Sequence, residues 1–252
     1  MSENTTDATL AEYCVTACAD IFTGAGEIMA SPMATMPLLG ARLARLTNEQ
    51  DLLITDGNAL ILADTPAIGK VGPVEGWMPF RKVFDVVASG RRHVVMGANQ
   101  IDRFGNQNLS AFGPVQQPTR QMFGVRGAPG NTINHITSYF VGNHTKRVFC
   151  ESVDIVSGVG WDKVDPDNPA YRFLNVHQVV SNLGVFDFAG PDHSMRAVSL
   201  HPGVTPEQVV ENTSFEVAGL EQAGVTRAPS YAELDLIATL DPKSLRSKEV
   251  RA

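Results

Sequence analysis

An apolar run at residues 94–96 leads directly into a polar segment whose side chains could bind a substrate. Residues 97–108 carry amide and carboxylate side chains and include a Gly-Asn turn. This pattern predicts a buried strand that ends in a polar loop. Open α/β sheets hold their ligands at the carboxyl ends of their strands, so Asn99 and Gln100 could hydrogen-bond a substrate there. The alternative is a plain strand–turn–strand hairpin in which both amides only satisfy the loop backbone.

A second candidate binding segment is the glycine-rich stretch at residues 124–131, which contains Gly127, Gly130 and one cation, Arg126. Glycines let backbone N–H groups approach an anion or a carbonyl oxygen closely. The stretch lacks the Lys-Ser/Thr pair of a phosphate-binding P-loop, so its glycine spacing alone is weak evidence for a phosphate site. Gly127 and Gly130 could therefore offer amides to an oxyanion, or they could only make a turn.

The cysteines and histidines do not predict a metal site. Three cysteines are an odd number, which disfavours a disulfide framework. Cys14 and Cys18 lie one helical turn apart with no histidine or acidic cluster at ligand spacing, so we expect them to be small buried apolar residues. The six histidines show no metal-ligand spacing. His135 follows the glycine-rich stretch and is considered for the site, although a single histidine is more often structural.

The composition indicates one globular domain over residues 1–252. Hydrophobic residues make up 43% and charged residues 19% of the chain, which is enough to bury a full core. The net charge of −7 and the scattered basic residues argue against a nucleic-acid partner. No apolar run is long enough to span a bilayer, and the N-terminus lacks the pattern of a secretory signal. We therefore expect no membrane partner and a cytoplasmic location.

Helical periodicity occurs in four segments. Thr9 and Glu12 form a potential capping box at the start of the first, and a proline occupies the first turn of the last. The four predicted helices are residues 10–22, a segment around 38–46, residues 80–88 and residues 205–212.

Short apolar runs bounded by turn residues predict the strands. Residues 58–76 are rich in Gly, Pro and Ala and show no clear period, so they read as a long loop. The polar end from about residue 243 is expected to be mobile. The predicted strands are residues 27–30, 52–54, 94–96, 147–150, 153–156, 176–180 and 185–188.

Three stretches, taken together and in order, resemble the β subunits of family I coenzyme A transferases. They are residues 97–106, the glycine-rich stretch 124–131 and residues 204–215. The resemblance runs over most of the chain, and the first stretch is fairly specific. Within the family, the glutaconate transferase type is nearest in layout. The sequence looks closer still to the β subunits of actinobacterial hydrolases that cleave a ring of cholesterol.

The resemblance implies an open CoA-transferase-like α/β sheet flanked by helices. It also implies a homologous α subunit as partner, an α2β2 heterotetramer, and an active site between the two kinds of chain. The substrate would be an acyl-CoA ester. No separate cofactor is implied, because coenzyme A enters as part of that substrate.

The sequence departs from the transferase pattern at the catalytic position. In the transferases, the strand that matches residues 52–54 ends in a glutamate followed by a small or polar residue and a glycine. Aligned on Gly57, that glutamate falls on Thr55. Transfer proceeds through an acyl-enzyme anhydride and a glutamyl-CoA thioester, and only a carboxylate forms both. Asp56 is adjacent, but successive side chains of a strand alternate in direction, so we expect it to face elsewhere.

Without an acyl-enzyme in this subunit, the resemblance points to hydrolysis. Water would attack a ring ketone β to the thioester, and the ring C–C bond would break as its electrons move into the thioester enolate. Arg126 is the expected cation for that enolate, since it lies in the loop where the family binds substrate, and a surface arginine is the alternative. Ser31, Met33 and Thr55 are expected to line the pocket. The general base is expected on the α subunit.

Three other functions remain open at this point. The chain could belong to a working CoA transferase that uses Asp56 or a carboxylate of the other chain. It could instead be a non-catalytic subunit that only stabilises an active partner. A sugar-phosphate-binding α/β domain is the third alternative, and the lack of a nearby lysine or Ser/Thr pair in the glycine-rich stretch disfavours it.

Overall fold

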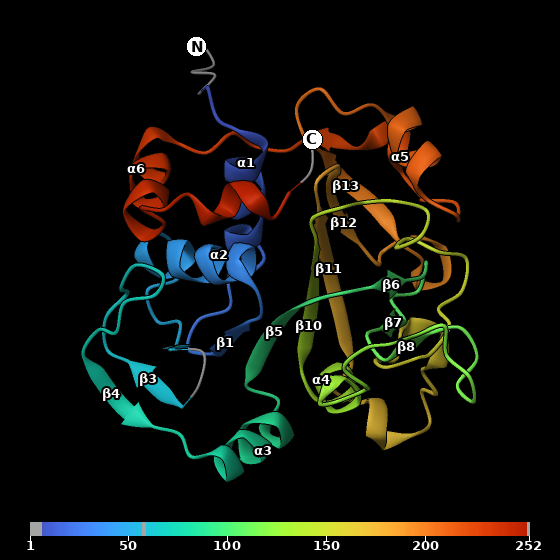
Figure 1. Ribbon diagram of the computed structural model, residues 1–252, viewed down its shortest axis with the longest axis horizontal. Coiled ribbons are helices and arrows are strands. Elements are labelled where there is room, and N and C mark those ends of the chain that lie inside the picture. The colour runs from blue at the N-terminus through green and yellow to red at the C-terminus, as the bar shows by residue number, and fades with distance from the viewer. Residues whose placement is uncertain (1–6, 57–58, 251–252) are drawn as a thin grey trace.

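The computed structural model describes residues 7–56 and 59–250. Its centre is a seven-stranded sheet with helices packed against it, so the predicted open α/β sheet is confirmed (Figure 1). The first four strands of the sheet pair in parallel, and their carboxyl ends therefore reach one edge. In sheet order the strands are β1 (Met29–Pro32), β5 (Arg92–Gly97), β10 (Ile136–Val141), β11 (Asn175–Ser181), β12 (Gly184–Asp187), β13 (Arg196–Leu200) and β14 (Gly224–Val225).

Alternation along β5 sends neighbouring side chains into two separate cores. Val95 packs into a core with three helices, whereas Val94 and Met96 belong to a second core on the other face. This follows from the two-residue period of a strand. The helices of the first core, which gather on one side of the sheet in Figure 1, are α1 (Leu10–Asp20), α2 (Thr35–Leu46) and α6 (Tyr231–Leu240).

The first helix begins where the sequence predicts. Thr9 and Glu12 form the expected capping box at its N-terminus. Cys14 and Cys18 are free thiols with no solvent exposure, as expected for small apolar residues. The helix also meets α2 closely, because a Cβ at Gly40 would lie 2.5 Å from the Cβ of Cys18.

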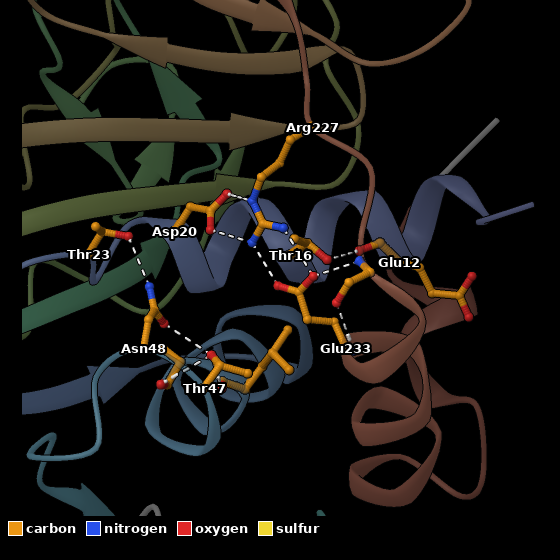
Figure 2. A network of polar contacts seen from close by, with 11 residues as sticks. Glu12, Thr16, Asp20, Thr23, Thr47, Asn48, Arg227 and Glu233 are labelled. Atoms are coloured by element: carbon orange, nitrogen blue, oxygen red, sulfur yellow. Dashed lines mark hydrogen bonds and ion pairs between the residues drawn. The ribbon is translucent and has the colours of Figure 1, made fainter. Parts of the chain in front are cut away.

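A network of charged residues joins the two ends of the chain on this side. Figure 2 shows Arg227 between Asp20 of α1 and Glu233 of α6. Its Nη2 lies 2.7 Å from an oxygen of each carboxylate. Planar guanidinium pairs of this kind are among the stronger surface contacts, so Arg227 holds α6 against α1.

The opposite face of the sheet is covered by loops and short elements packed around the second core. The apolar run at 94–96 does lead into a polar loop, and a small hairpin follows within that loop, so both interpretations of this segment hold in part. Part of the glycine-rich stretch is helical rather than loop. The elements here are β6 (Gln100–Ile101), β7 (Gln107–Asn108), β8 (Ala111–Phe112), β9 (Arg120–Gln121), α4 (Ala128–Asn134) and α5 (Pro206–Asn212).

A small three-stranded sheet lies beyond β1 and leads into α3 (Phe80–Ser89). Its strands are β2 (Ile54–Thr55), β3 (Leu60–Leu62) and β4 (Val74–Trp77). The prediction of one long loop over residues 58–76 was therefore wrong, since it contains two strands. Local hydrophobic patterns do not indicate these two strands, because β3 is only three residues long and β4 is largely exposed.

Two further strand predictions were also wrong. Residues 147–150 and 153–156 form turns and irregular segments instead, and Phe149 makes a single bridge to Ile101. Both Phe149 and Val153 are buried in spite of this. Apolar runs of this length indicate burial, but burial alone does not require ladder pairing.

The C-terminal segment makes specific contacts with the rest of the chain, and the mobility that its polar composition predicts stays a prediction. It forms a short 3₁₀-helix at Leu245–Lys248, and Arg246 pairs with Asp241 and with Glu12 of α1. Val250 packs against the first core. Within the described ranges, no helix has the length and apolar character needed to cross a bilayer.

Candidate functional site

A cavity of about 600 Å³, here called the larger cavity, lies at the carboxyl ends of β5 and β10. Met96 and Gly97 of β5 and Phe140 and Val141 of β10 form part of its wall. This is the edge where open α/β sheets hold ligands, because loops converge there on a rigid sheet. The remaining wall comes from Met33, from the loops that follow β5, β7, β9 and β10, and from the C-terminal segment.

Arg126 lines this cavity from the glycine-rich stretch. Its backbone has a φ of +47°, in the left-handed region, and its side chain is exposed. The guanidinium carbon lies 5.2 Å from the ring centre of Phe123, which lines the same cavity. A cation stacked on an aromatic ring retains free donors at its edges. Arg126 therefore presents positive charge at the cavity.

The two amides after β5 occupy different positions. Asn99 lines the larger cavity. Gln100 is buried outside the cavity wall, where its Oε1 accepts hydrogen bonds from Asn108 Nδ2 at 2.6 Å and from the Asp154 amide at 3.0 Å. Gln100 could bind either a substrate or the loop itself. This geometry supports the second role, in which its side chain hydrogen-bonds groups of the loop.

Other polar residues of the same segment hold the loop together. Asp102 Oδ1 accepts hydrogen bonds from the amides of Phe104 and Asn106, each at 3.0 Å. Gln107 Nε2 donates to the carbonyl of Gly97 at 2.6 Å, whereas Gln107 Oε1 is buried with no partner within the described part of the chain. These contacts fix the end of β5 and so shape the wall of the cavity.

A smaller cavity, of about 150 Å³, lies next to the larger one, and Met33 lines both. Ser31 and Thr55 line the smaller cavity, as does Arg92 at the start of β5. The predicted pocket residues Ser31, Met33 and Thr55 are thus brought together.

Arg92 was missed in the sequence. Its side chain is buried, and its Nε donates to Ser31 Oγ at 2.7 Å. The neighbouring Arg91 is exposed, whereas strand alternation places Arg92 on the face shared by Val94 and Met96. The two-residue spacing of Arg92, Val94 and Met96 was the signal in the sequence that could have indicated that Arg92 is buried.

No carboxylate of the described residues takes the place of the missing glutamate. The smaller cavity, which Thr55 lines, contains no aspartate or glutamate among its described lining residues. Asp56 Oδ1 instead accepts hydrogen bonds from the amides of Ala59 and Leu60, both at 3.0 Å. Asp56 therefore joins the end of β2 to the start of β3.

The two glycines of the glycine-rich stretch lie outside the lining of both cavities. Gly127 is the N-cap of α4, and its carbonyl accepts a hydrogen bond from the Asn131 amide. Gly130 lies within α4, where a Cβ would be 3.6 Å from Val87. Their proposed role as oxyanion donors therefore stays a prediction.

The histidines are mostly buried and engaged with protein groups. His135 Nε2 lies 3.4 Å from Arg92 Nη1, and burial followed by the charge of Arg92 lowers its pKa to about 4. His144 is stacked on Phe149 and hydrogen-bonded to Ser181 and Thr213. In the described ranges, no group of three or more His, Cys, Asp or Glu residues could hold a metal ion.

Comparisons with known proteins identify the family of the chain. No family model matches the chain. It is 78% identical, over 99% of both chains, to the cholesterol ring-cleaving hydrolase IpdB subunit of Rhodococcus jostii. The crystal structure of Rhodococcus jostii IpdAB matches with a TM-score of 0.97 at 77% identity, covering 98% of this chain and 100% of that one.

A more distant match extends the likeness in fold alone. Glutaconate CoA-transferase of Acidaminococcus fermentans matches with a TM-score of 0.78 at 24% identity, covering 96% of this chain and 98% of that one. The predicted resemblance to CoA-transferase β subunits is thus confirmed at the level of the fold. By the extent and identity of the Rhodococcus match, this chain belongs to the family of cholesterol ring-cleaving hydrolase IpdB subunits.

Proposed function

We propose that this chain is the β subunit of a hydrolase that opens the ring of a cyclic β-keto acyl-CoA ester during cholesterol degradation. The near-complete match to IpdB subunits supports the proposal most strongly. The cavity at Thr55 agrees with it, because no carboxylate of the described residues stands there to accept an acyl group. Hydrolysis needs no acyl-enzyme on this chain.

The proposed reaction balances without a resident cofactor. The oxygen of water bonds to the ring ketone carbon, and the bond between that carbon and the α carbon of the thioester breaks. The released electron pair forms the thioester enolate, which then takes a proton at the α carbon. The former ketone carbon becomes a carboxylate, and coenzyme A stays attached to the product.

Arg126 is the proposed stabiliser of the enolate. It lines the larger cavity and is stacked on Phe123. A fixed cation beside a developing oxyanion can lower the barrier by about 3 kcal/mol. The base that activates water is proposed to lie on the α subunit. Among the described residues that line this cavity on this chain, the only acidic one is Glu249 of the C-terminal segment.

Replacement of Arg126 by alanine tests this role. In a complex with the α subunit, Arg126→Ala should lower kcat about a hundredfold or more, while the complex stays assembled. Liquid chromatography of the products would separate free CoA from the ring-opened CoA ester. Arg120→Ala is the matched control, because Arg120 is exposed on β9 and does not line the cavity. An unchanged kcat in Arg126→Ala would remove Arg126 from the mechanism.

A CoA transferase remains the second candidate, because the fold is shared with glutaconate CoA-transferase. Borohydride or hydroxylamine trapping during turnover separates the two. The hydrolase should leave this chain unmodified. In a transferase that uses Asp56, borohydride should reduce the aspartyl-CoA thioester to an alcohol, or hydroxylamine should convert it to a hydroxamate, with release of CoA in both cases. Mass spectrometry of the intact chain would detect the change in mass.

The partner is proposed to be a homologous α subunit in an α2β2 assembly. Large apolar side chains are exposed on β4 and α3, where Trp77, Phe80 and Phe84 are 71%, 78% and 62% exposed. Exposed apolar surface of this kind marks interaction sites. Light scattering of the co-expressed chains would give the stoichiometry. The cytoplasmic location and the lack of a nucleic-acid partner stay predictions.

A further inference from the structure

Asn131 joins α4 to the central sheet through its side-chain amide. Asn131 is buried, with 4% of its surface exposed. Its Oδ1 accepts a hydrogen bond from Arg92 Nη1 at 2.8 Å, and its Nδ2 donates to the Met96 sulfur at 3.3 Å. Arg92 and Met96 lie on the same face of β5, where Arg92 lines the smaller cavity and Met96 the larger one. One amide thus fastens α4 to residues that line both cavities.

The backbone of Asn131 is hydrogen-bonded in both directions. Its N–H donates to the carbonyl of Gly127 at 2.9 Å, and its carbonyl accepts a hydrogen bond from Thr137 Oγ1 at 3.2 Å. Thr137 belongs to β10 and has no solvent exposure. Through Asn131, α4 is therefore attached to two neighbouring strands, β5 and β10. A buried polar network whose members have partners is rigid.

These contacts continue into the turn that carries Arg126. Gly127, whose carbonyl accepts the Asn131 N–H, directly follows Arg126 in the chain. The turn is closed by a hydrogen bond of 3.0 Å from the Ala128 N–H to the carbonyl of Val125. The φ of Arg126, +47°, is a left-handed conformation that costs free energy for a residue with a side chain and persists only where the surrounding structure holds it. The attachment of α4 to the sheet therefore affects where the Arg126 side chain points.

A second asparagine of α4 shows the contrast. Asn134 Nδ2 donates to the carbonyl of Gly130 at 2.8 Å, so its side chain bonds within the helix. Asn134 is half-buried, whereas Asn131 is buried. The hydrogen bond of Asn134 stiffens α4 itself, whereas those of Asn131 fix where α4 lies on the sheet.

We propose that Asn131 is a positioning residue for ring opening, because it holds the turn that presents Arg126 to the larger cavity. The inference rests on the proposed function for the task of Arg126. Without the amide of Asn131, α4 loses its side-chain attachment to β5, and the backbone of Arg126 can relax away from its left-handed conformation. The guanidinium then leaves the place where the enolate oxygen forms. Since the enolate develops only in the transition state, kcat should fall more than KM rises.

Hydrogen exchange tests the structural half of the proposal without any substrate. Asn131→Leu has a similar shape but lacks both polar side-chain atoms. In the complex with the α subunit, exchange of peptides from residues 122–128 should become about tenfold faster or more, because the turn is no longer held. Asn134→Ala is the matched control and should leave this exchange within about twofold of wild type. Equal exchange in Asn131→Leu and the wild type would overturn the proposal.

A double-mutant cycle with Arg126 tests the functional half. Asn131→Leu should lower kcat for ring opening about tenfold or more, with KM within about threefold of wild type. Asn131→Asp keeps an acceptor for Arg92 and should recover most of the loss. If Asn131 acts through Arg126, kcat of the double variant Asn131→Leu/Arg126→Ala should equal that of Arg126→Ala within about threefold. Losses that multiply would show a general structural effect and refute the proposal.

A second variant serves if Asn131→Leu does not assemble. Thr137→Val keeps the shape of the side chain but removes the hydroxyl that donates to the carbonyl of Asn131. It should speed the same exchange and lower kcat about threefold or more, with no further loss of kcat when Arg126 is already alanine. Unchanged exchange, or losses that multiply, would again refute the proposal. Formation of ring-opened product by the wild-type complex reports on the proposed function alone, so either idea can fail without the other.

Discussion

Two arginines of this chain face cavities, and their surroundings suit them to different tasks. Arg126 is exposed on a loop and stacked on Phe123, where a partner chain or a substrate can cover it. Arg92 is buried and fixed by Ser31 and Asn131 before any ligand arrives. A preorganised buried cation discriminates between charged and neutral groups. The electrostatic attraction of an exposed cation for an anion becomes strong only when water is excluded.

Thr55 provides a residue-scale prediction about covalent catalysis. If no acyl-enzyme forms here, Thr55→Val removes a hydroxyl but keeps the shape of the cavity wall. We expect turnover of the complex to stay within about tenfold of wild type, because one hydrogen bond contributes roughly 1 kcal/mol. Steady-state assays of ring opening would measure it. A loss of a thousandfold or more would instead show that the hydroxyl takes part in the chemistry.

The sequence could identify some site residues and not others for a physical reason. Thr55 could be identified because it occupies the strand-end position at which the transferases carry their catalytic glutamate. Gln100 could not be assigned, since a polar side chain that binds the loop has the same sequence signature as one that binds a ligand. Its contacts to Asn108 and Asp154 come from residues 8 and 54 positions away.

At the scale of elements, the contact between α1 and α2 depends on Gly40. A Cβ there would lie 2.5 Å from the Cβ and 2.7 Å from the carbonyl carbon of Cys18. Gly40→Ala should gain up to about 1 kcal/mol of helix propensity but lose about 1–3 kcal/mol to overpacking. We expect a net fall in the free energy of unfolding, measured by urea titration.

Gly224→Ala is the control for this prediction. A Cβ at Gly224 would meet only the carbonyl oxygen of Val198, at 3.8 Å, which is an ordinary contact. Its stability should stay within about 0.5 kcal/mol of wild type. Equal stability of Gly40→Ala and the wild type would show that the two helices can move apart at little cost.

The network at α6 predicts a pH-dependent contribution to stability. Burial raises the pKa of Glu233, but hydrogen bonds from Arg227 and Ser230 outweigh it, so that the pKa lies below its ordinary value of 4.5. A depressed carboxyl pKa contributes stability that is present above the unfolded pKa and lost as pH falls through the folded pKa.

Arg227→Gln should therefore lower the free energy of unfolding most near neutral pH. Because Arg227 is about half exposed, solvent screening limits the loss to roughly 1 kcal/mol at about pH 7, and the loss should shrink below about pH 4. Arg196→Gln breaks a comparable pair with Asp187 and is the control. Urea titrations of all three proteins across this pH range would measure the difference. A loss that does not change with pH would exclude Glu233 as its source.

At the scale of the whole molecule, four strands of the central sheet and most helices were predictable, whereas β10 and the connections were not. β11 and β12 were anticipated because their apolar runs are bounded by a turn. β10 was overlooked although it lies at the middle of the parallel strands, since Thr137 and Ser138 interrupt its apolar run. Burial of those two hydroxyl residues depends on neighbours distant in the chain, which local periodicity does not report.

The C-terminal segment shows how such distant contacts complete the site. Lys248 and Glu249 line the larger cavity, and Arg246 fastens them through Asp241 and Glu12. The side chain of Asp241 is 1% exposed, so its pairing is screened little by water. The first helix and the last residues of the chain thus hold one wall of the cavity together.

Arg246→Gln should release this wall. The substitution removes the positive partner of two largely buried carboxylates, Asp241 and Glu12. This should lower the free energy of unfolding by about 2 kcal/mol. Hydrogen exchange of peptides from residues 242–252 should become at least tenfold faster, and KM for the acyl-CoA ester should rise more than kcat falls. Lys82→Gln, which breaks an exposed pair with Asp85, should change neither the exchange rate of these peptides nor KM. Unchanged exchange in Arg246→Gln would mean that apolar packing of Val250, rather than the ion pairs, holds the segment in place.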